Sequence, residues 1–211
     1  DETEMSQNSR SGWALGLLAA SLWWIGADPA IAQGIGLPNQ NRDIPLEIVA
    51  DDGIEWRKEE QVYIARGNAY AKQGDVSVHA DVLTAYYRDA EGGGTQIWRI
   101  DADRNVRIVS PTQKSYGDKA VYDVAQGIMV MTGKVRMVTE TDQITARDSL
   151  EYWEKRGLAV ARGNAIASRG KNRLRADILT AHFKADKNGK TRMTRIDAFD
   201  NVLGTLVTEG V

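Results

Sequence analysis

Ala65-Arg66-Gly67-Asn68-Ala69 recurs 96 positions later as Ala161-Arg162-Gly163-Asn164-Ala165, and this repeat decides the fold. The same offset relates the segment Ala80–Ala85 to Ala176–Ala181, in which Ala-Asp-Val-Leu-Thr-Ala becomes Ala-Asp-Ile-Leu-Thr-Ala. A fixed period of this kind indicates that one structural unit occurs twice in the chain.

A shorter unit lies inside the large repeat. Three times an Asp stands fifteen residues before a Gly. Thirteen residues after each of these glycines comes an Ala, and an Asp follows that Ala within two positions. The Asp and Gly pairs are Asp52 and Gly67, Asp118 and Gly133, and Asp148 and Gly163. The chain therefore divides into five modules, which start at Asp52, Asp81, Asp118, Asp148 and Asp177.

Each module starts with the alternation of a half-buried β-strand. Apolar side chains occupy every second position after the Asp, as they do when one face of a strand is buried. The alternating sets are Asp52-Ile54-Trp56, Asp81-Leu83-Ala85-Tyr87, Asp118-Ala120-Tyr122, Asp148-Leu150-Tyr152 and Asp177-Leu179-Ala181-Phe183. We therefore predict an all-β fold.

Corners and turns are also visible in the sequence. The apolar positions are even-numbered up to Ala80 and odd-numbered from Leu83 onward, which predicts a bulge or corner between Ala80 and Asp81. Gly92-Gly93-Gly94 and Lys187-Asn188-Gly189 supply residues that tolerate positive φ, and we place both segments at hairpin tips.

The composition fits one folded domain without thiol chemistry. The 211 residues include only four prolines, and the chain is long enough for one substantial core. The absence of cysteine excludes a disulfide framework, a thiolate nucleophile and a zinc–thiolate cluster. The formal net charge is −2, and basic residues alternate with acids along the predicted strands, which argues against nucleic acid as a partner.

Residues 1–32 have the features of a secretory signal peptide. The apolar run from Trp13 to Ile25 is too short to span a bilayer comfortably, and Ala30-Ile31-Ala32 is a small-x-small cleavage site. We predict cleavage after Ala32, with an uncleaved anchor or a buried hydrophobic helix as the alternative. Met5 is a plausible initiator, so residues 1–4 are read as an upstream extension. Cleavage removes one base and four acids and changes the net charge to +1.

The sequence contains no recognisable catalytic or metal site. His79 and His182 have no Glu or second His at metal-ligand spacing, and we interpret them as solvent-facing strand residues. The Asp that starts each module recurs at equivalent positions, so we assign it a structural task, the capping of backbone N–H groups at a strand corner. We therefore predict no enzyme activity, no metal and no cofactor.

The order and spacing of these segments resemble the OstA-like family of lipopolysaccharide-transport proteins. The resemblance extends from Ile44 to Val207, and it rests on the following segments: Pro45–Asp51, Ala65–Ala69, Ala80–Leu83, Gly117–Ala120 and Met131–Val135. It implies a β-jellyroll of stacked antiparallel strands, slightly open and V-shaped, over residues 44–207. Residues 33–43 would then be a flexible lead-in, and residues 208–211 a C-terminal tail.

The resemblance implies a periplasmic carrier that holds lipopolysaccharide in an apolar groove and passes it from the inner to the outer membrane. The implied partners are the jellyroll domains of the inner-membrane C-type and outer-membrane D-type transport components, and further copies of the chain joined head to tail through edge strands. The alternatives are a membrane-anchored C-type component of the same pathway, a structural jellyroll scaffold that binds no lipid, and an accessory domain of an enzyme.

The alternation of buried positions selects the residues that would line such a groove. The candidates are Ile54, Trp56, Leu83, Tyr87, Tyr122, Met131, Val135, Met137, Leu150 and Tyr152. A tightly packed core would use the same residues, so the pattern does not separate lipid contact from ordinary packing. If they line a groove, Met131→Asp or Leu150→Asp should lower lipid capture.

Overall fold

The computed structural model describes residues 46–90, 93–185 and 191–207. The predicted signal peptide, lead-in and C-terminal tail, and the second hairpin tip at Lys187–Gly189, lie outside these residues. The described chain is almost entirely β-strand. The elements are β1 (Leu46–Val49), β2 (Gly53–Arg57), β3 (Val62–Gln73), β4 (Val76–Asp89), β5 (Thr95–Val109), β6 (Gln113–Asp123), β7 (Ile128–Thr132), β8 (Val135–Thr139), β9 (Asp142–Ala146), β10 (Ser149–Trp153), the 3-10 turn η1 (Glu154–Arg156), β11 (Leu158–Arg169), β12 (Asn172–Ala185), β13 (Thr191–Phe199) and β14 (Leu203–Thr205).

The 96-residue repeat corresponds to two copies of one three-strand unit. β3 and β11 begin at residues 62 and 158, β4 and β12 at 76 and 172, and β5 and β13 at 95 and 191. Each pair of starts differs by the offset seen in the sequence. Gly93 and Gly94 have φ of +97° and +84° between β4 and β5, which confirms the first predicted hairpin tip.

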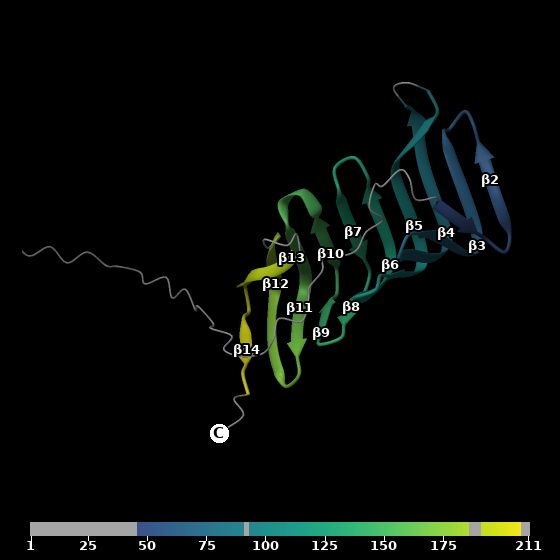
Figure 1. Ribbon diagram of the computed structural model, residues 1–211. Coiled ribbons are helices and arrows are strands. Elements are labelled where there is room, and N and C mark those ends of the chain that lie inside the picture. Colours follow the sequence, from purple (N-terminus) through teal and green to yellow (C-terminus); the bar gives the residue numbers. More distant parts are fainter. Residues whose placement is uncertain (1–45, 91–92, 186–190, 208–211) are drawn as a thin grey trace, which may run out of the picture.

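The strands form one antiparallel sheet in which neighbours in the chain are mostly neighbours in space. Figure 1 shows them following one another along one long axis, from β2 at one end to β14 at the other. The long strands pair with different partners over their two halves. One half of β3 pairs with β2 and the other with β1, and β6 likewise pairs with β7 and then β8.

The sheet therefore divides into two layers. The first layer contains β2, β7, β10 and β13, and the second contains β1, β8, β9 and β14; β3, β4, β5, β6, β11 and β12 run through both. This arrangement, in which bent strands contribute to two facing layers, is the β-jellyroll that the family resemblance implies.

The strands bend at corners where two consecutive residues have positive φ. The five corners are Gly67-Asn68, Arg104-Asn105, Gly133-Lys134, Gly163-Asn164 and Asp200-Asn201. The pairing of β4 with β5 shifts register between His79 and Val82, which confirms the corner predicted beside Asp81. Two residues lie at each of these corners, so the buried parity is kept across it, as from Met131 to Val135, whereas it changes on a partner strand, as from Ala80 to Leu83 on β4. The inward-facing positions on both sides of a corner belong to the same core.

Inward-facing residues of the first layer form straight cross-strand rows. One row, from β2 to β13, is Ile54, Ala65, Leu83, Ala102, Ala120, Met131, Leu150, Ala161, Leu179 and Ala198. The next is Trp56, Tyr63, Ala85, Ile100, Tyr122, Met129, Tyr152, Ala159, Ala181 and Ile196. Alternation in the sequence thus becomes a continuous apolar face.

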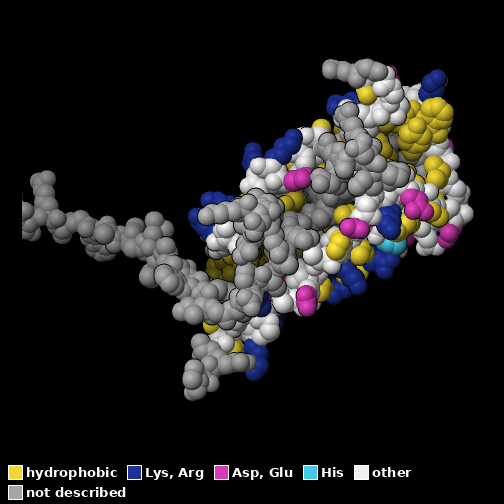
Figure 2. All heavy atoms as spheres, in the orientation of Figure 1, with side chains coloured by type: hydrophobic (Ala, Val, Ile, Leu, Met, Phe, Trp, Pro, Cys, Tyr) yellow, Lys and Arg dark blue, Asp and Glu magenta, His cyan; other side chains and the backbone are white. Residues whose placement is uncertain are grey.

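The two rows end in exposed side chains, and this corrects one expectation. Ile54 and Trp56 lie on the inward rows, but 52% and 58% of their surfaces are exposed, so neither is buried. The reason is that β2 pairs only with β3 and forms an edge of the sheet. Figure 2 shows hydrophobic side chains exposed at the end of the molecule where β2 lies.

Candidate functional site

Eight of the ten predicted groove residues are buried. Seven of them belong to one contiguous apolar cluster: Leu83, Tyr122, Met131, Val135, Met137, Leu150 and Tyr152. The eighth, Tyr87, is 4% exposed and lies against the Tyr63 ring, with 5.0 Å between ring centroids. Its hydroxyl accepts a 2.7 Å hydrogen bond from Trp56 Nε1, which links it to the exposed edge.

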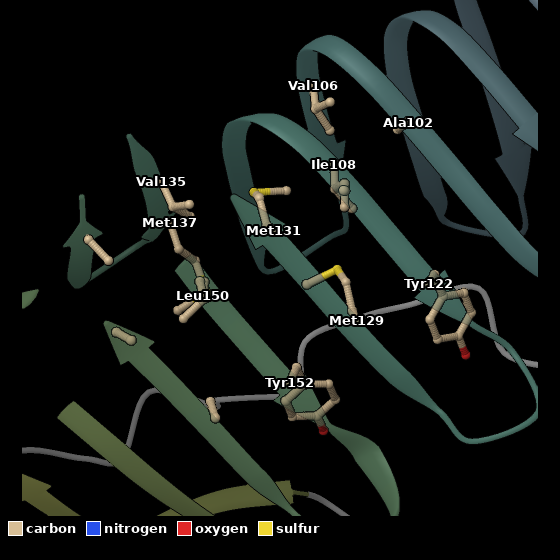
Figure 3. Packing of buried hydrophobic residues seen from close by; sticks show 14 of the residues in the cluster. Ala102, Val106, Ile108, Tyr122, Met129, Met131, Val135, Met137, Leu150 and Tyr152 are labelled. Atoms are coloured by element: carbon tan, nitrogen blue, oxygen red, sulfur yellow. The ribbon is translucent and has the colours of Figure 1, made fainter. Parts of the chain in front are cut away.

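The centre of this cluster contains methionine from two strands of different layers. Met131 on β7 lies in register with Ala120 on one side and Leu150 on the other, and its exposed fraction is zero. Met137 on β8 faces the same interior from the second layer. Figure 3 shows these side chains together, with the rings of Tyr122 and Tyr152 at one end of the group. Unbranched, polarisable Met side chains adapt to apolar partners of variable shape.

The predicted list left out most of the buried residues of this interior, and four of them show why. Met129 lies between Tyr122 and Tyr152 and is 1% exposed, and its alternation with Met131 was a sufficient signal. Val106 and Ile108, at 2% and 5% exposed, also alternate, but their corner contains no glycine and the module was not recognised. Ser115 is 1% exposed, and nothing in the sequence distinguishes a buried serine from an exposed one.

The two tyrosines are held in their neutral form. Burial, together with the negative charges of Glu154 and Asp123, raises the pKa of Tyr122 to about 12. Burial and Glu154 also raise the pKa of Tyr152. Both rings therefore act as largely apolar walls at neutral pH.

Polar groups without partners lie inside the second layer. Ser115 and Gln113 face inward from β6 and are 1% and 7% exposed. Ser115 Oγ and Gln113 Nε2 have no hydrogen-bond partner among the described residues. Buried polar atoms are normally paired, so each unpaired atom is a place where a polar group of a ligand would be stabilising.

The module Asp residues have the structural position that was predicted, but with different partners. Asp81 Oδ1 accepts a 2.9 Å hydrogen bond from Asn105 Nδ2, and Asp177 Oδ2 accepts a 2.6 Å bond from Asn201 Nδ2. These carboxylates thus receive side-chain amides from the corner of the next strand, whereas the prediction was capping of backbone N–H groups. Within the described residues, no group of three or more His, Asp or Glu is placed to hold a metal ion.

Both histidines lie on outward faces. The His79 ring packs on Tyr70 with 4.6 Å between centroids, and burial together with the nearby Arg107 lowers its pKa. His182 Nε2 lies 2.9 Å from Asp197 Oδ2. A depression of about 490 Å³ runs along the corners beside His79, and its lining includes Asp81, Asn105 and Lys134. Most of its lining residues are polar or charged, but Ala80 and Val106 of the buried cluster also line it.

Comparison with known proteins finds a family that matches part of the chain. Residues 47–148 match the family described as LptA/(LptD N-terminal domain) LPS transport protein. An uncharacterized protein of Rhizobium meliloti is 28% identical over 112 residues, which cover 51% of this chain and 58% of that protein. The match thus spans little more than half the length of that relative.

In the part of the chain that the structure describes, no helix has the length and apolar character needed to cross a membrane.

A solved structure has the same fold. The crystal structure of LptH, described as the LptA homologous periplasmic component of the conserved lipopolysaccharide transport device from Pseudomonas aeruginosa, superposes with a TM-score of 0.50. The two sequences are 17% identical, and the alignment covers 59% of this chain and 87% of LptH. Residues 47–148, just under half of the chain, therefore match the family of LptA and the LptD N-terminal domain, and the LptH structure shares the fold.

Proposed function

We propose that this chain is a periplasmic carrier that binds the acyl chains of lipopolysaccharide between its two layers and passes the lipid from the inner to the outer membrane. The observation that carries the proposal is the composition of the interior. Eleven of the 23 residues in the buried cluster are alanine. Facing sheets pack about 10 Å apart when large side chains fill the space between them. An interior lined so largely by alanine suits layers that separate to admit apolar chains.

The energetics of the cargo require such shielding. Each buried methylene contributes about 0.8 kcal/mol, so a chain of about twelve carbons loses on the order of 10 kcal/mol when it is exposed to water. The inward rows of the first layer extend across ten strands without a charged residue, from Ile54 to Ala198. Such a surface shields several chains without any covalent chemistry.

Two polar atoms suit the same cargo. Ser115 Oγ and Gln113 Nε2 face the interior without partners in the described chain. An acyl chain with a hydroxyl or ester oxygen near its head would supply the missing hydrogen bonds at the edge of the apolar region. A purely structural core gains nothing from these unpaired groups.

The proposal extends to compartment and partners. Export with cleavage after Ala32 would deliver the domain to the periplasm. At the sheet edges, β1, β2, β13 and β14 each have one side with no partner strand among the described residues, where backbone groups could pair with a further strand. We assign these edges to head-to-tail association with other copies and with the jellyroll domains of the C-type and D-type components.

Photo-crosslinking at two neighbouring aromatic positions tests the lipid site. Tyr152 is 5% exposed and faces the interior, whereas the adjacent Trp153 faces outward and is half-buried. We would replace each in turn by p-azidophenylalanine, which is close to tyrosine in size, and irradiate the full chain with purified lipopolysaccharide. We expect adducts at position 152 and none at position 153. Adducts at neither position in folded protein would favour a structural scaffold, and adducts at both would indicate nonspecific surface contact.

A further inference from the structure

The outward face of the second layer carries many exposed bases and few acids. Two rows of residues run in register across the strands on this face. They contain the exposed residues Lys72, Arg107, Lys114, Arg136, Arg173 and Arg175. We call this set the basic face. None of the six forms an ion pair with a described residue, and the acid in these rows is Glu47, at the edge strand β1.

The outward face of the first layer is different, because its bases are paired with acids. The pairs include Arg57 with Glu55, Arg99 with Asp101, Lys119 with Asp103, Arg162 with Glu151, and Arg195 with Asp197, at 2.6 to 3.0 Å. The sequence expectation that bases and acids are interspersed is therefore correct for the first layer and wrong for the second. Positive charge that is not paired with an acid is therefore concentrated on the outward face of the second layer.

Aromatic and aliphatic side chains lie between the bases. Arg136 lies over the Tyr116 ring, 4.4 Å from its centroid, and Tyr70 packs on His79. Val109 and Val138 lie in register with Lys114 in the same rows and are partly exposed. Figure 2 shows basic side chains gathered beside a histidine along the lower edge of the molecule. Bases mixed with tyrosine and valine are typical of surfaces that meet lipid headgroups.

The size of the basic face suits an extended partner. It crosses eight strands, from β3 to β12 by way of β8 and β9, and adjacent strands are about 4.8 Å apart, so it is about 34 Å long. A single small anion would occupy only a fraction of this length. Among the described residues, a second copy of the chain offers no row of unpaired acids to match it, since Glu55, Asp101, Asp103, Glu151 and Asp197 on the first layer are already paired with bases.

We propose that the basic face docks the domain on the surface of a bilayer that contains anionic lipid, with the apolar interior facing away from that contact. Each exposed base near such a surface adds to the attraction, and salt weakens it. The inference goes beyond lipid carriage: it assigns a second, external lipid contact to a different face. It does not require lipopolysaccharide to enter the interior, so either proposal can fail alone.

Single cysteine labels test which face meets the bilayer, and the natural chain contains no cysteine that would interfere. We would place a polarity-sensitive fluorophore at Gln143→Cys on the basic side, or at Thr180→Cys on the outward face of the first layer. With phosphatidylcholine vesicles that contain phosphatidylglycerol, we expect a blue shift at position 143 only. Omission of phosphatidylglycerol or addition of salt should remove the shift.

Matched charge variants test the bases themselves. Arg107→Gln/Arg136→Gln/Arg175→Gln should lower vesicle affinity by about one to two orders of magnitude. The control, Arg66→Gln/Lys119→Gln/Arg162→Gln, has the same net charge and should retain the affinity within about twofold. Equal losses in the two triple variants, or equal shifts of the two labels, would overturn the proposal. A shift at position 143 with an acidic polypeptide but not with vesicles would also overturn it and assign the face to a protein partner.

Discussion

Asp148 lies directly against Gly163 and occupies the space that a Cβ on that glycine would need. The same relationship joins Asp118 to Gly133 and Asp52 to Gly67, where the added Cβ would lie 2.5 Å from Asp52 Oδ2. The fifteen-residue spacing in the sequence is therefore a contact in the fold. Two features therefore require glycine at each of these positions: φ is positive, and the contacting Asp leaves no room for a side chain.

Gly163→Ala should lower the free energy of unfolding by about 2–4 kcal/mol, because a positive φ and overpacking each add to the cost. Gly94→Ala separates the two effects. Gly94 has φ of +84°, nearly the same as +85° at Gly163, but a Cβ there meets no atom within 4 Å. We expect a loss of about 1–2 kcal/mol for this control in urea unfolding.

A double variant identifies the neighbour responsible. Asp148→Ala should recover part of the stability that Gly163→Ala loses, because it removes the carboxylate from the new Cβ. If the two substitutions are additive, the contact does not contribute and the backbone conformation alone accounts for the loss.

Leu150→Ala should reduce stability by about 2–5 kcal/mol, because Leu150 is 1% exposed at the centre of the cluster and its loss leaves a cavity. Leu203→Ala removes the same atoms from a side chain that is 61% exposed and should change stability by less than about 0.5 kcal/mol. Chemical denaturation of both variants checks the difference. Similar losses would mean that the interior is not the stabilising core.

The sequence reveals the strands and their inward faces, because both follow from alternation and from the repeat. It does not reveal which strands lie at the edge. Ile54 alternates as Leu83 does, yet it is exposed, since only the pairing order places β2 at the end of the sheet. Likewise, Arg107 and Arg136 are far apart in the sequence, and only the register brings them into one row.

The sequence pattern also did not predict the corners that lack glycine. The corners at Arg104-Asn105 and Asp200-Asn201 use asparagine, which adopts positive φ more readily than most residues. Their 96-residue separation repeats the separation of Asn68 and Asn164. A search for recurrent Asn in place of recurrent Gly would have found them, and with them the buried Val106 and Ile108.

Stability should fall at alkaline pH because of Tyr122. Its pKa is raised to about 12 in the folded chain, against 10.0 for a free phenol. Above pH 10 the unfolded chain loses a proton that the folded chain keeps, so the contribution is complete below pH 10 and is lost as the pH rises through about 12. We expect a loss of roughly 1–2 kcal/mol over this window, because residual solvent screening reduces the full effect of the pKa difference.

The Tyr122→Phe variant tests this assignment, since it retains the ring and removes the titrating group. Its unfolding free energy should decline less steeply between pH 10 and 12, with the remaining slope due in part to Tyr152, whose pKa is also raised. Parallel curves for the two proteins would show that Tyr122 is not shielded from water.

The head-to-tail association that we propose should depend on Trp56. Trp56 and Ile54 end the inward rows at β2, and Ile196, which is 37% exposed, ends one of them at β13. Pairing these edges between copies would continue the apolar rows from one domain into the next. Trp56→Glu places a charge in that contact, so we expect self-association to weaken at least about tenfold in sedimentation equilibrium. Tyr87→Phe is the control, because it removes the same Trp56 hydrogen bond without changing the exposed edge. An equal effect of both variants would mean that the hydrogen bond, and not the exposed indole, supports association.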